Sequence, residues 1–578
     1  MFSQPNTRVC APELAAKIKA CLHVSLLFLR DSSGVRNAVS DPTRAGQNHK
    51  FAGSCAVLTG GSKNDLTSGP NLFRFVIGAD CGGRRVDNMR IAFVWSDAYL
   101  VMYAMPLPFG HLVNAIRGEG HTVKLFNLPL EGWRAESPEF RDAIADFAPD
   151  VIAATAWPIS LQRTLAAVDA AHAVAPAATR ILGGNYASLN PQQAWATGRF
   201  DYILTGEAEP TFAPFLRLLA VGDLDGLKRL PGLYFQLPDG TTVSNRNDFH
   251  DDLDALGAID YDFLELDRCI DKGYMRSLLG PRRRAPLFAT RGCRHRCYFC
   301  TASLMNGPRV RHYSVEHVVG QIRLLYEKHR IRMILFMDDN ILEDPAFFKD
   351  LCRAVADLGL RDLVLDAYRG MRLEDLDDEL LRLAKLANFK VISIAPESGS
   401  ERVRGMMNKL MTTDQIVAAA RMVSASGLLL RGFFILGYPG ETPAERQQSY
   451  RMIRALDFDI VQLHRYSALP GTVTFKQLLR SGKVAPEHAD LGFINGGALP
   501  DFNGDGKDID REQFAVYVRL YLLRPWKLLH LFYFLNFGGI VRAFRGIVIG
   551  RLRAGLGGIL PGPGVGPMPP STDTGSRG

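Results

Sequence analysis

Three cysteines lie close together near the middle of this 578-residue chain, at Cys293, Cys297 and Cys300. Their C-x3-C-x2-C spacing brings three thiolates within reach of one inorganic cluster, because soft thiolate sulfur is the preferred protein ligand of iron–sulfur clusters. A cuboidal [4Fe–4S] cluster has four irons, so three cysteines leave one iron open to another molecule. An electron carrier usually closes that position with a fourth cysteine. The pattern therefore favours a cluster that takes part in chemistry.

Two other uses of closely spaced cysteines fit less well. A structural zinc site usually has four ligands in paired sets, and no second Cys-x-x-Cys follows Cys300. His295 lies inside the run, but it alternates too closely with the cysteines to resemble a zinc knuckle. Disulfides are not expected in a chain without a convincing secretion signal. An iron–sulfur cluster is the best interpretation.

The cysteine loop, with the aromatic residues Tyr298 and Phe299 in its last gap, resembles the radical S-adenosylmethionine (SAM) superfamily. The resemblance implies that SAM chelates the open iron through its amino and carboxylate groups. It further implies that one electron cleaves SAM to a 5′-deoxyadenosyl radical, with Phe299 beside the cofactors. An external one-electron reductant of the flavodoxin or ferredoxin type would supply the electron.

Short apolar runs alternate with helical patterns after the cysteines, which is typical of repeated βα units around a parallel sheet. We expect strands at residues 286–290, 333–337, 363–368, 391–395, 429–436 and 460–463. Six such units fit the partial (β/α)6 TIM-like barrel that the resemblance implies. In barrels of this kind the chemistry lies at the carboxyl ends of the strands.

Polar residues follow several of these expected strands, and the resemblance gives them roles in binding SAM. Asp338 and Asp339 stand where many family members have a Gly-Gly-Glu stretch. Glu397 and Ser398 match a Glu-Ser element, and Arg372 matches a residue that pairs with the SAM carboxylate. Gly437 ends a strand against which adenine packs. The run His464-Arg465-Tyr466 on the last strand is a candidate for facing substrate.

The chain ahead of the cysteines also alternates strands and helices, with strands expected at 89–95, 151–156, 179–183 and 202–204. This pattern predicts a doubly wound, Rossmann-like α/β domain, which binds ligands beyond the carboxyl ends of its strands. Gly-Gly-x-x-Ala-Ser-x-x-Pro (183–191) and Gly-Glu-x-Glu (206–209) resemble the cobalamin-binding domain fused to many radical SAM barrels. The residues implied as cobalamin contacts are Gly183, Gly184, Asn185, Gly206 and Glu207, and strand position adds Thr155 as a guard of the lower face.

One element of mutase-type cobalamin domains, Asp-x-His-x-x-Gly with its cobalt-ligating histidine, is missing here. Two interpretations remain open. The domain binds cobalamin with no protein ligand on the lower face, or it keeps the fold and has lost the cofactor. We favour binding.

Domain boundaries follow from these patterns. We predict an α/β domain at 89–220, a linker at 221–280, the barrel at 281–475, a helical region at 476–558 and a disordered tail at 559–578. Residues 1–88 show no sustained periodicity, so we hypothesise that Met89 is the true start. The run Arg282-Arg283-Arg284 is interpreted as a solvated face. The helical region, rich in aromatic residues and arginine, packs on the barrel mouth, forms a substrate lid or lies on a membrane surface.

Composition limits the partners. The net charge of +8 comes from scattered arginines, and no RNA-binding module is recognisable, so we expect no nucleic-acid partner. Nine cysteines without a regular framework suit a reducing cytoplasm.

The expected activity, implied by the resemblance, is cobalamin-dependent radical methyl transfer to an unactivated carbon of a small molecule. Two alternatives remain open. One is a cyclisation or rearrangement, as in anaerobic tetrapyrrole cyclisation, and the other is a non-catalytic iron–sulfur scaffold.

Overall fold

The computed structural model describes residues 88–96, 105–158, 160–273, 275, 283–371, 373, 376–485 and 501–534. The predicted disordered tail lies outside these residues, and so do nearly all of the residues ahead of Met89 and the candidate Arg372.

The first sheet has seven strands in the order β2-β1-β3-β4-β5-β6-β7, of which β1 to β5 run parallel. The doubly wound prediction is therefore confirmed, and the order 2-1-3-4-5 is that of flavodoxin-like folds. β6 and β7 pair antiparallel and extend the sheet, so the expected linker contributes two strands. The bounds are β1 Arg90–Trp95, β2 Thr122–Asn127, β3 Val151–Thr155, β4 Thr179–Gly183, β5 Tyr202–Leu204, β6 Leu233–Gln236 and β7 Thr242–Ser244.

After its exposed first residue, Arg90, strand β1 is apolar and buried, as expected for a strand covered by helices on both faces of the sheet. Ile91 and Phe93 pack into one core cluster, which includes Phe109 of α2 (Leu107–Ala115) and Phe212 of α8 (Glu209–Val221). The alternate residues Ala92 and Val94 pack on the other face, against α4 (Pro138–Phe147) and α5 (Leu161–Val174). Successive strand side chains point to opposite faces, so β1 is buried on both sides.

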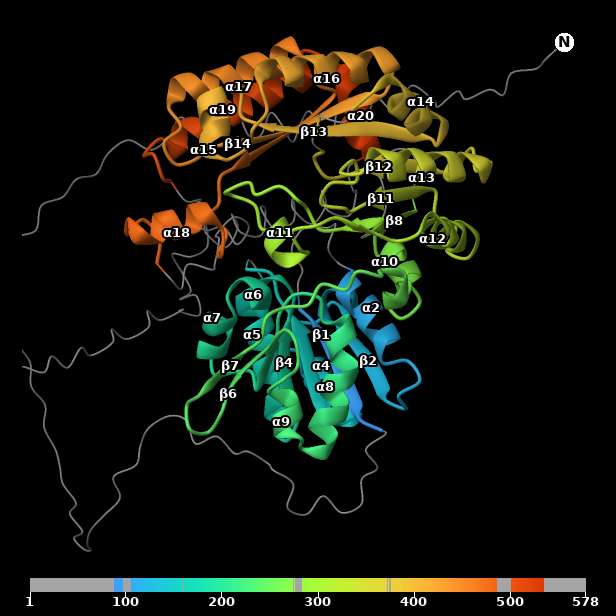
Figure 1. Ribbon diagram of the computed structural model, residues 1–578, viewed down its shortest axis with the longest axis vertical. Helices are drawn as coiled ribbons and strands as arrows, with labels where there is room; N and C mark the ends of the chain where they lie inside the picture. Colours follow the sequence, from blue (N-terminus) through green and yellow to red (C-terminus); the bar gives the residue numbers. More distant parts are fainter. Residues whose placement is uncertain are drawn as a thin grey trace, which may run out of the picture. The chain divides into compact units, whose positions relative to one another are not determined.

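The second sheet has six strands, all parallel, in the order β8-β11-β12-β13-β14-β15. The six expected strands are confirmed, and the sheet ends at β8 and β15, as an open partial barrel requires. Helices alternate with the strands along the chain (Figure 1). The strand bounds are β8 Arg284–Leu287, β11 Met333–Phe336, β12 Val364–Ala367, β13 Phe389–Glu397, β14 Leu429–Leu436 and β15 Ile460–Arg465.

The helices of the barrel begin at capping residues that the sequence supplies. α12 (Val315–Glu327) follows Ser314, whose hydroxyl accepts from the backbone N–H of His317. α13 (Pro345–Asp357) follows Asp344, and α14 (Asp378–Leu386) follows Asp377. Capping boxes begin α16 (Thr413–Ser426) and α17 (Pro443–Ala455). Such caps satisfy backbone donors that no preceding turn can reach.

A buried ion pair links two strands inside the barrel. The guanidinium of Arg431 on β14 lies 2.8 Å from a carboxylate oxygen of Asp366 on β12, and both side chains are 1% exposed. The hydroxyl of Ser393 on β13 accepts from the same guanidinium. Arg284, the first residue of β8, is also buried. The interpretation of the arginine run as a solvated face is therefore wrong for Arg284.

The C-terminal helices cover the open edge of the barrel sheet. They are α19 (Gly506–Tyr517), the π-helical turn Val518–Leu522 and α20 (Pro525–Phe534). The hydroxyls of Tyr517 and Tyr521 accept from the backbone N–H groups of Leu463 and Val461 on β15. An unpaired strand edge is a template for aggregation, and these tyrosines occupy it. Within the described residues no helix could cross a bilayer.

Residues 501–512 carry the spacing Asp-x-Asn-x-Asp-Gly-x5-Glu, which is typical of EF-hand calcium loops. The structure uses the segment differently. Asp501 accepts from the backbone N–H groups of Gly504 and Gly506 at the start of α19. Asp505 and Glu512 both bind the guanidinium of Arg446 on α17. A protein cation therefore neutralises these carboxylates and fastens α19 to the barrel.

We predict that Arg431→Met strongly destabilises the barrel, because it leaves Asp366 buried and unpaired. Losing one partner of a buried pair typically costs about 3–5 kcal/mol. Urea denaturation followed by far-UV circular dichroism measures the effect. Arg353→Met removes exposed pairs with Asp350 and Glu379 and is the control, with an expected change below about 1 kcal/mol. Equal midpoints for the two variants would contradict the prediction.

Candidate functional site

A cavity of about 580 Å³ is lined by residues from the carboxyl ends of both sheets. This volume lies in the range of small-molecule and cofactor sites. Trp95, Thr155 and Gly183 line it from the ends of β1, β3 and β4. The cysteine loop and the strand ends of the barrel complete the wall. The carboxyl ends of parallel strands meet at one edge of a sheet, which is why both halves present their polar loops here.

The cysteine loop is a hairpin between two short strands, β9 (Thr290–Arg291) and β10 (Arg311–His312), which pair antiparallel. Gly292 starts the loop with a φ of 98°, and a Cβ there would lie 2.0 Å from the backbone oxygen of Arg309. Only glycine fits such a left-handed, crowded position. The N–H of Cys293 then donates to the backbone oxygen of Gly307, which closes the loop.

All three cysteines line the cavity. Burial raises the pKa of Cys293 to about 12 and that of Cys300 to about 11, so these thiols are protonated until a metal displaces the proton. Among the described residues, no three His, Cys, Asp or Glu side chains converge on a single ion. A cuboidal cluster does not require this, because each cysteine binds a different iron. The donor set therefore fits an iron–sulfur cluster.

Two buried acids bind the backbone before the cysteine loop and side chains within it. Asp338 accepts from the backbone N–H groups of Ala289 and Thr290, just before the loop. Glu343 lies 2.9 Å from the Nε of Arg294 and 3.4 Å from the Nε2 of His295, inside the loop. These acids therefore fix the backbone on which the cysteines sit.

Two charged pairs face the cavity from the barrel. Asp339 lies 3.1 Å from Arg369, which follows β12. Glu397, the last residue of β13, lies 3.5 Å from Lys409. Glu397 has a φ of 64°, a conformation that non-glycine residues rarely adopt and that is concentrated at functional sites. Burial raises the pKa of Glu397, and the charge of Lys409 opposes that rise.

An apolar wall adjoins these charges. Phe433 and Ile435 of β14 face the cavity, as expected for alternate residues of one strand. His464 of β15 lies beside them, with its ring 6.4 Å from that of Phe433. Burial lowers the pKa of His464, so the imidazole is neutral near pH 7. A neutral imidazole both donates and accepts a hydrogen bond.

The α/β wall has two features that fit a bound polar cofactor. The buried Nδ2 atom of Asn185 has no hydrogen-bond partner among the described residues, although such atoms are nearly always paired. Gly184 has a φ of 82°, and a Cβ there would lie 2.1 Å from the Oγ1 of Thr155. Thr155 thus excludes a side chain at position 184, so the backbone there stays bare, and the donor of Asn185 lies beside it.

Most of the predicted site residues line this one cavity. They are Cys293, Cys297, Phe299, Cys300, Asp339, Glu397, Thr155, Gly183, Gly184, Asn185, Gly206 and Glu207. Asp338, Ser398 and Gly437 lie outside its wall and make protein contacts instead. Of the run on β15, only His464 faces the cavity, because Arg465 pairs with Asp510 and Tyr466 packs on Tyr438.

Sequence reasoning missed several cavity residues. Arg369 and Gly370 directly follow β12, so the strand-end rule could have found them. Phe433 and Ile435 lie in the strand that was expected to pack against adenine, and strand alternation could have singled them out. Lys409 lies in the loop after α15 (Glu401–Met406), and a helix separates it from its partner Glu397 at the end of β13. No local sequence pattern marks Lys409 as a cavity residue.

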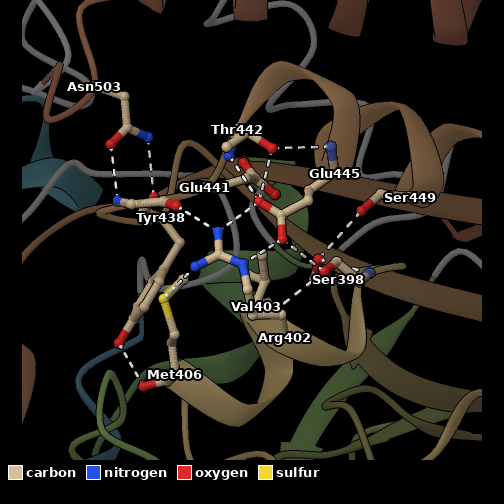
Figure 2. Close-up of polar contacts among 12 residues, drawn as sticks. Ser398, Arg402, Val403, Met406, Tyr438, Glu441, Thr442, Glu445, Ser449 and Asn503 are labelled. Carbon is tan, nitrogen blue, oxygen red and sulfur yellow. Dashed lines mark hydrogen bonds and ion pairs between the residues drawn. The ribbon is translucent and has the colours of Figure 1, made fainter.

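A hydrogen-bond network outside the cavity fixes the loops that follow β13 and β14 (Figure 2). Glu445 accepts from Arg402, from Ser400 and from the backbone of Thr442. The carbonyl of Gly440 accepts from Arg402, and Asn503 bridges the backbones of Tyr438 and Gly440. The hydrogen bonds from Arg402 hold the pKa of Glu445 well below its usual value. The two strand-end loops therefore form one rigid unit.

Comparison with known proteins agrees with this geometry. Residues 287–453 match the model of the radical SAM superfamily, and residues 100–216 match the model of the B12 binding domain. The chain therefore carries a radical SAM domain and a B12 binding domain, and it is an enzyme. The cofactors of this family, a [4Fe–4S] cluster, SAM and cobalamin, suit the donor sets described above.

Two curated relatives and one solved structure show how far the likeness extends. Cytidylyl-2-hydroxyethylphosphonate methyltransferase of Streptomyces wedmorensis is 24% identical over 66% of this chain and 79% of its own length. Anaerobic magnesium-protoporphyrin IX monomethyl ester cyclase of Rubrivivax gelatinosus is 24% identical over 70% and 72%. The cobalamin-dependent SAM radical enzyme OxsB, solved with aqua-cobalamin and SAM, superposes with a TM-score of 0.60 at 17% identity, over 81% and 72%.

We predict that Glu445→Gln lowers the free energy of unfolding by about 1.5–3 kcal/mol at neutral pH, since hydrogen bonds to a charged group are lost. The folded-state pKa of Glu445 lies below its unfolded value. Its contribution is therefore complete above about pH 4.3 and is lost as the pH falls further. Denaturant unfolding at pH 7, 5 and 4 should show the gap between wild type and variant shrinking only at pH 4.

Glu379→Gln provides the control, because Glu379 pairs with Lys349 while half exposed. Exposed pairs contribute about 0–1 kcal/mol. A gap between wild type and Glu445→Gln that stayed constant between pH 7 and pH 4 would refute the assignment of a lowered pKa.

Proposed function

We propose that this enzyme transfers a methyl group to an unactivated carbon of a small molecule, using a [4Fe–4S] cluster, SAM and cobalamin. The observation that carries the proposal is a single cavity lined both by the three cysteines and by Gly183, Gly184 and Asn185. A radical methyltransferase needs its cluster and its methyl carrier to face one substrate space. The relative from Streptomyces wedmorensis, a methyltransferase, supports this reading.

The barrel residues fit the polar and apolar parts of SAM. Cys293, Cys297 and Cys300 would hold the cluster. Glu397 and Asp339 offer carboxylates to an amino group, while Lys409 and Arg369 offer cations to a carboxylate. Phe433 and Ile435 provide a flat apolar wall suited to adenine. Arg372 remains a proposed carboxylate partner from the sequence.

The α/β residues fit cobalamin. Gly184 presents bare backbone at the cavity wall, and Asn185 offers its Nδ2, which has no partner among the described residues. When bound, the cluster and SAM supply a carbon radical, and cobalamin supplies a transferable methyl group. The protein's share is binding, orientation and exclusion of water. Trp95, Phe109 and Phe212 line the cavity with buried apolar surface, which keeps solvent from a reactive species.

His464 is proposed as a substrate contact. Its neutral ring lies at the cavity wall beside Phe433, where it can hydrogen-bond a polar group of the substrate without adding charge. A carboxylate or cation at this place would exclude substrates of like charge.

A second candidate function is radical cyclisation without net methylation. The relative from Rubrivivax gelatinosus, a cyclase of magnesium-protoporphyrin IX monomethyl ester, supports it over 70% of this chain. The same cavity would serve, since cyclisation needs the same radical source. The products distinguish the two functions.

Reconstitution without oxygen tests the proposal. With iron, sulfide, hydroxocobalamin, SAM and a low-potential reductant, we expect both 5′-deoxyadenosine and S-adenosylhomocysteine, quantified by mass spectrometry. Cys297→Ala should lower both by at least about a hundredfold, because the cluster loses a ligand. Cys352→Ala changes a buried cysteine away from the cavity and is the control.

The outcomes separate the alternatives. Deoxyadenosine without S-adenosylhomocysteine would favour the cyclase. Neither product from protein with a complete iron content would leave only the scaffold interpretation.

Gly184→Ala tests the cobalamin wall. We predict that cobalamin retention, read from the visible spectrum after gel filtration, falls about tenfold while iron content is unchanged. The added methyl would collide with Thr155 and push the loop into the cavity. Gly198→Ala is the matched control, because Gly198 is also left-handed but has open space around it. Wild-type retention in Gly184→Ala would contradict the prediction, and an equal loss in both variants would trace the effect to backbone strain at left-handed glycines.

The remaining proposals concern partners, location and boundaries. We propose a flavodoxin- or ferredoxin-type reductant and a reducing cytoplasmic setting, both of which a low-potential cluster needs. The exposed side chains of Leu522, Leu523 and Trp526 beside Arg524 support peripheral membrane contact through the C-terminal region. The domain boundaries of the sequence analysis stay predictions.

A further inference from the structure

Two acids of the α/β domain contact the cysteine hairpin. Glu207 and Glu209 follow β5 in the Gly-Glu-x-Glu motif, and their side chains are only 4% and 10% exposed. Glu207 binds Arg311 through both of its oxygens, each at 2.7 Å, and lies 3.4 Å from Arg291. Glu209 lies 2.9 Å from Arg291. Two acids and two arginines thus form a buried cluster of four charges.

The two arginines lie on the paired strands at the base of the cysteine hairpin. Arg291 lies on β9, two residues before Cys293, and Arg311 is its direct partner on β10. Like charges directly opposite each other on paired strands repel. Glu207 contacts both guanidiniums and neutralises this repulsion. The hairpin therefore depends for its charge balance on acids from another domain, 104 residues away in sequence for the Glu207–Arg311 pair.

Arg311 also fixes the interior of the hairpin. Its guanidinium donates to the backbone oxygens of Asn306 and His250. The side chain of Asn306 in turn donates to Asp339, the carboxylate at the cavity wall. One guanidinium thus connects the Gly-Glu-x-Glu loop, the cysteine hairpin and, through Asn306, the cavity carboxylate.

We propose that Glu207, Glu209, Arg291 and Arg311 form a clamp that positions the cysteine hairpin on the cobalamin-binding domain. These four are positioning residues that act through the hairpin. The Gly-Glu-x-Glu acids then set where the cluster stands relative to the α/β wall, instead of contacting cobalamin. A clamp made of buried charges is selective, because a displaced hairpin would leave charges unpaired in a low-dielectric interior. This inference concerns the cluster's position and holds whether the enzyme methylates or cyclises.

Glu207→Gln tests the clamp, because it keeps the shape of the side chain and removes the charge. We expect backbone amides of residues 290–312 to exchange hydrogen about tenfold faster in the variant. In anaerobically reconstituted holoenzyme, the electron paramagnetic resonance signal of the reduced cluster should broaden or shift. Iron content, cobalamin retention and far-UV circular dichroism should remain at wild-type values.

Asp251→Asn is the matched control. Asp251 pairs with Arg309 at 2.8 Å, and so joins the chain beside His250 to the same hairpin, but both side chains are more than 70% exposed. We expect less than about a twofold change in exchange for this variant, since exposed ion pairs contribute little to stability. Equal exchange in Glu207→Gln and Asp251→Asn would overturn the clamp.

Two further variants keep the test decisive if Glu207→Gln folds poorly. Glu209→Gln removes only the contact to Arg291 and leaves the two-point pair of Glu207 with Arg311 in place. It should give an intermediate change in exchange and in the cluster signal. Arg311→Lys keeps the charge but loses the two-point contact. It should therefore speed amide exchange in the hairpin, but less than Glu207→Gln does. A loss of cobalamin with an unchanged cluster signal in Glu209→Gln would instead assign the motif to the cofactor.

Discussion

All strands of the barrel sheet run parallel, and this constraint decides where the candidate functional side chains of the barrel lie. A parallel sheet gathers the carboxyl ends of its strands along one edge, so loops far apart in sequence meet there. The α/β sheet obeys the same rule for β1 to β5. With both carboxyl edges lining one cavity, the cysteine hairpin and the Gly-Gly-Asn loop share a single space.

The strands of both sheets were largely predictable because each is a short apolar run. β2 was missed, since Thr122–Asn127 mixes polar and apolar residues at the edge of its sheet. β6 and β7 fell within the expected linker. They are short, they run antiparallel, and β7 is largely solvent-exposed, so neither shows the continuous apolar pattern of a buried parallel strand.

Site residues were predictable where chemistry depends on residue type and spacing, as in the three cysteines and Gly183-Gly184. Partners brought together only by the fold were not. Lys409 meets Glu397, and Arg311 meets Glu207, without any local pattern. Arg284 shows the opposite error, because charge in a sequence suggests solvent while the barrel buries this guanidinium completely. Periodicity reports which face is apolar, but it carries no information about compensated charge.

Adjacent acids at the strand ends divide two tasks between them. Side chains alternate in extended backbone, so neighbours at a strand end point in opposite directions. Asp339 faces the cavity, whereas Asp338 turns inward and holds the backbone of Ala289 and Thr290. Glu397 also faces the cavity while Ser398 contacts Ser449 and Arg404, but here the left-handed backbone of Glu397, not strand alternation, separates the two side chains. One residue of each pair thus faces the cavity, and the other fixes the loop that presents it. Glu207 departs from this division: it reaches the cavity wall, yet both of its oxygens are engaged by Arg311, so a residue at a strand end that lines a cavity need not be free to bind what enters it.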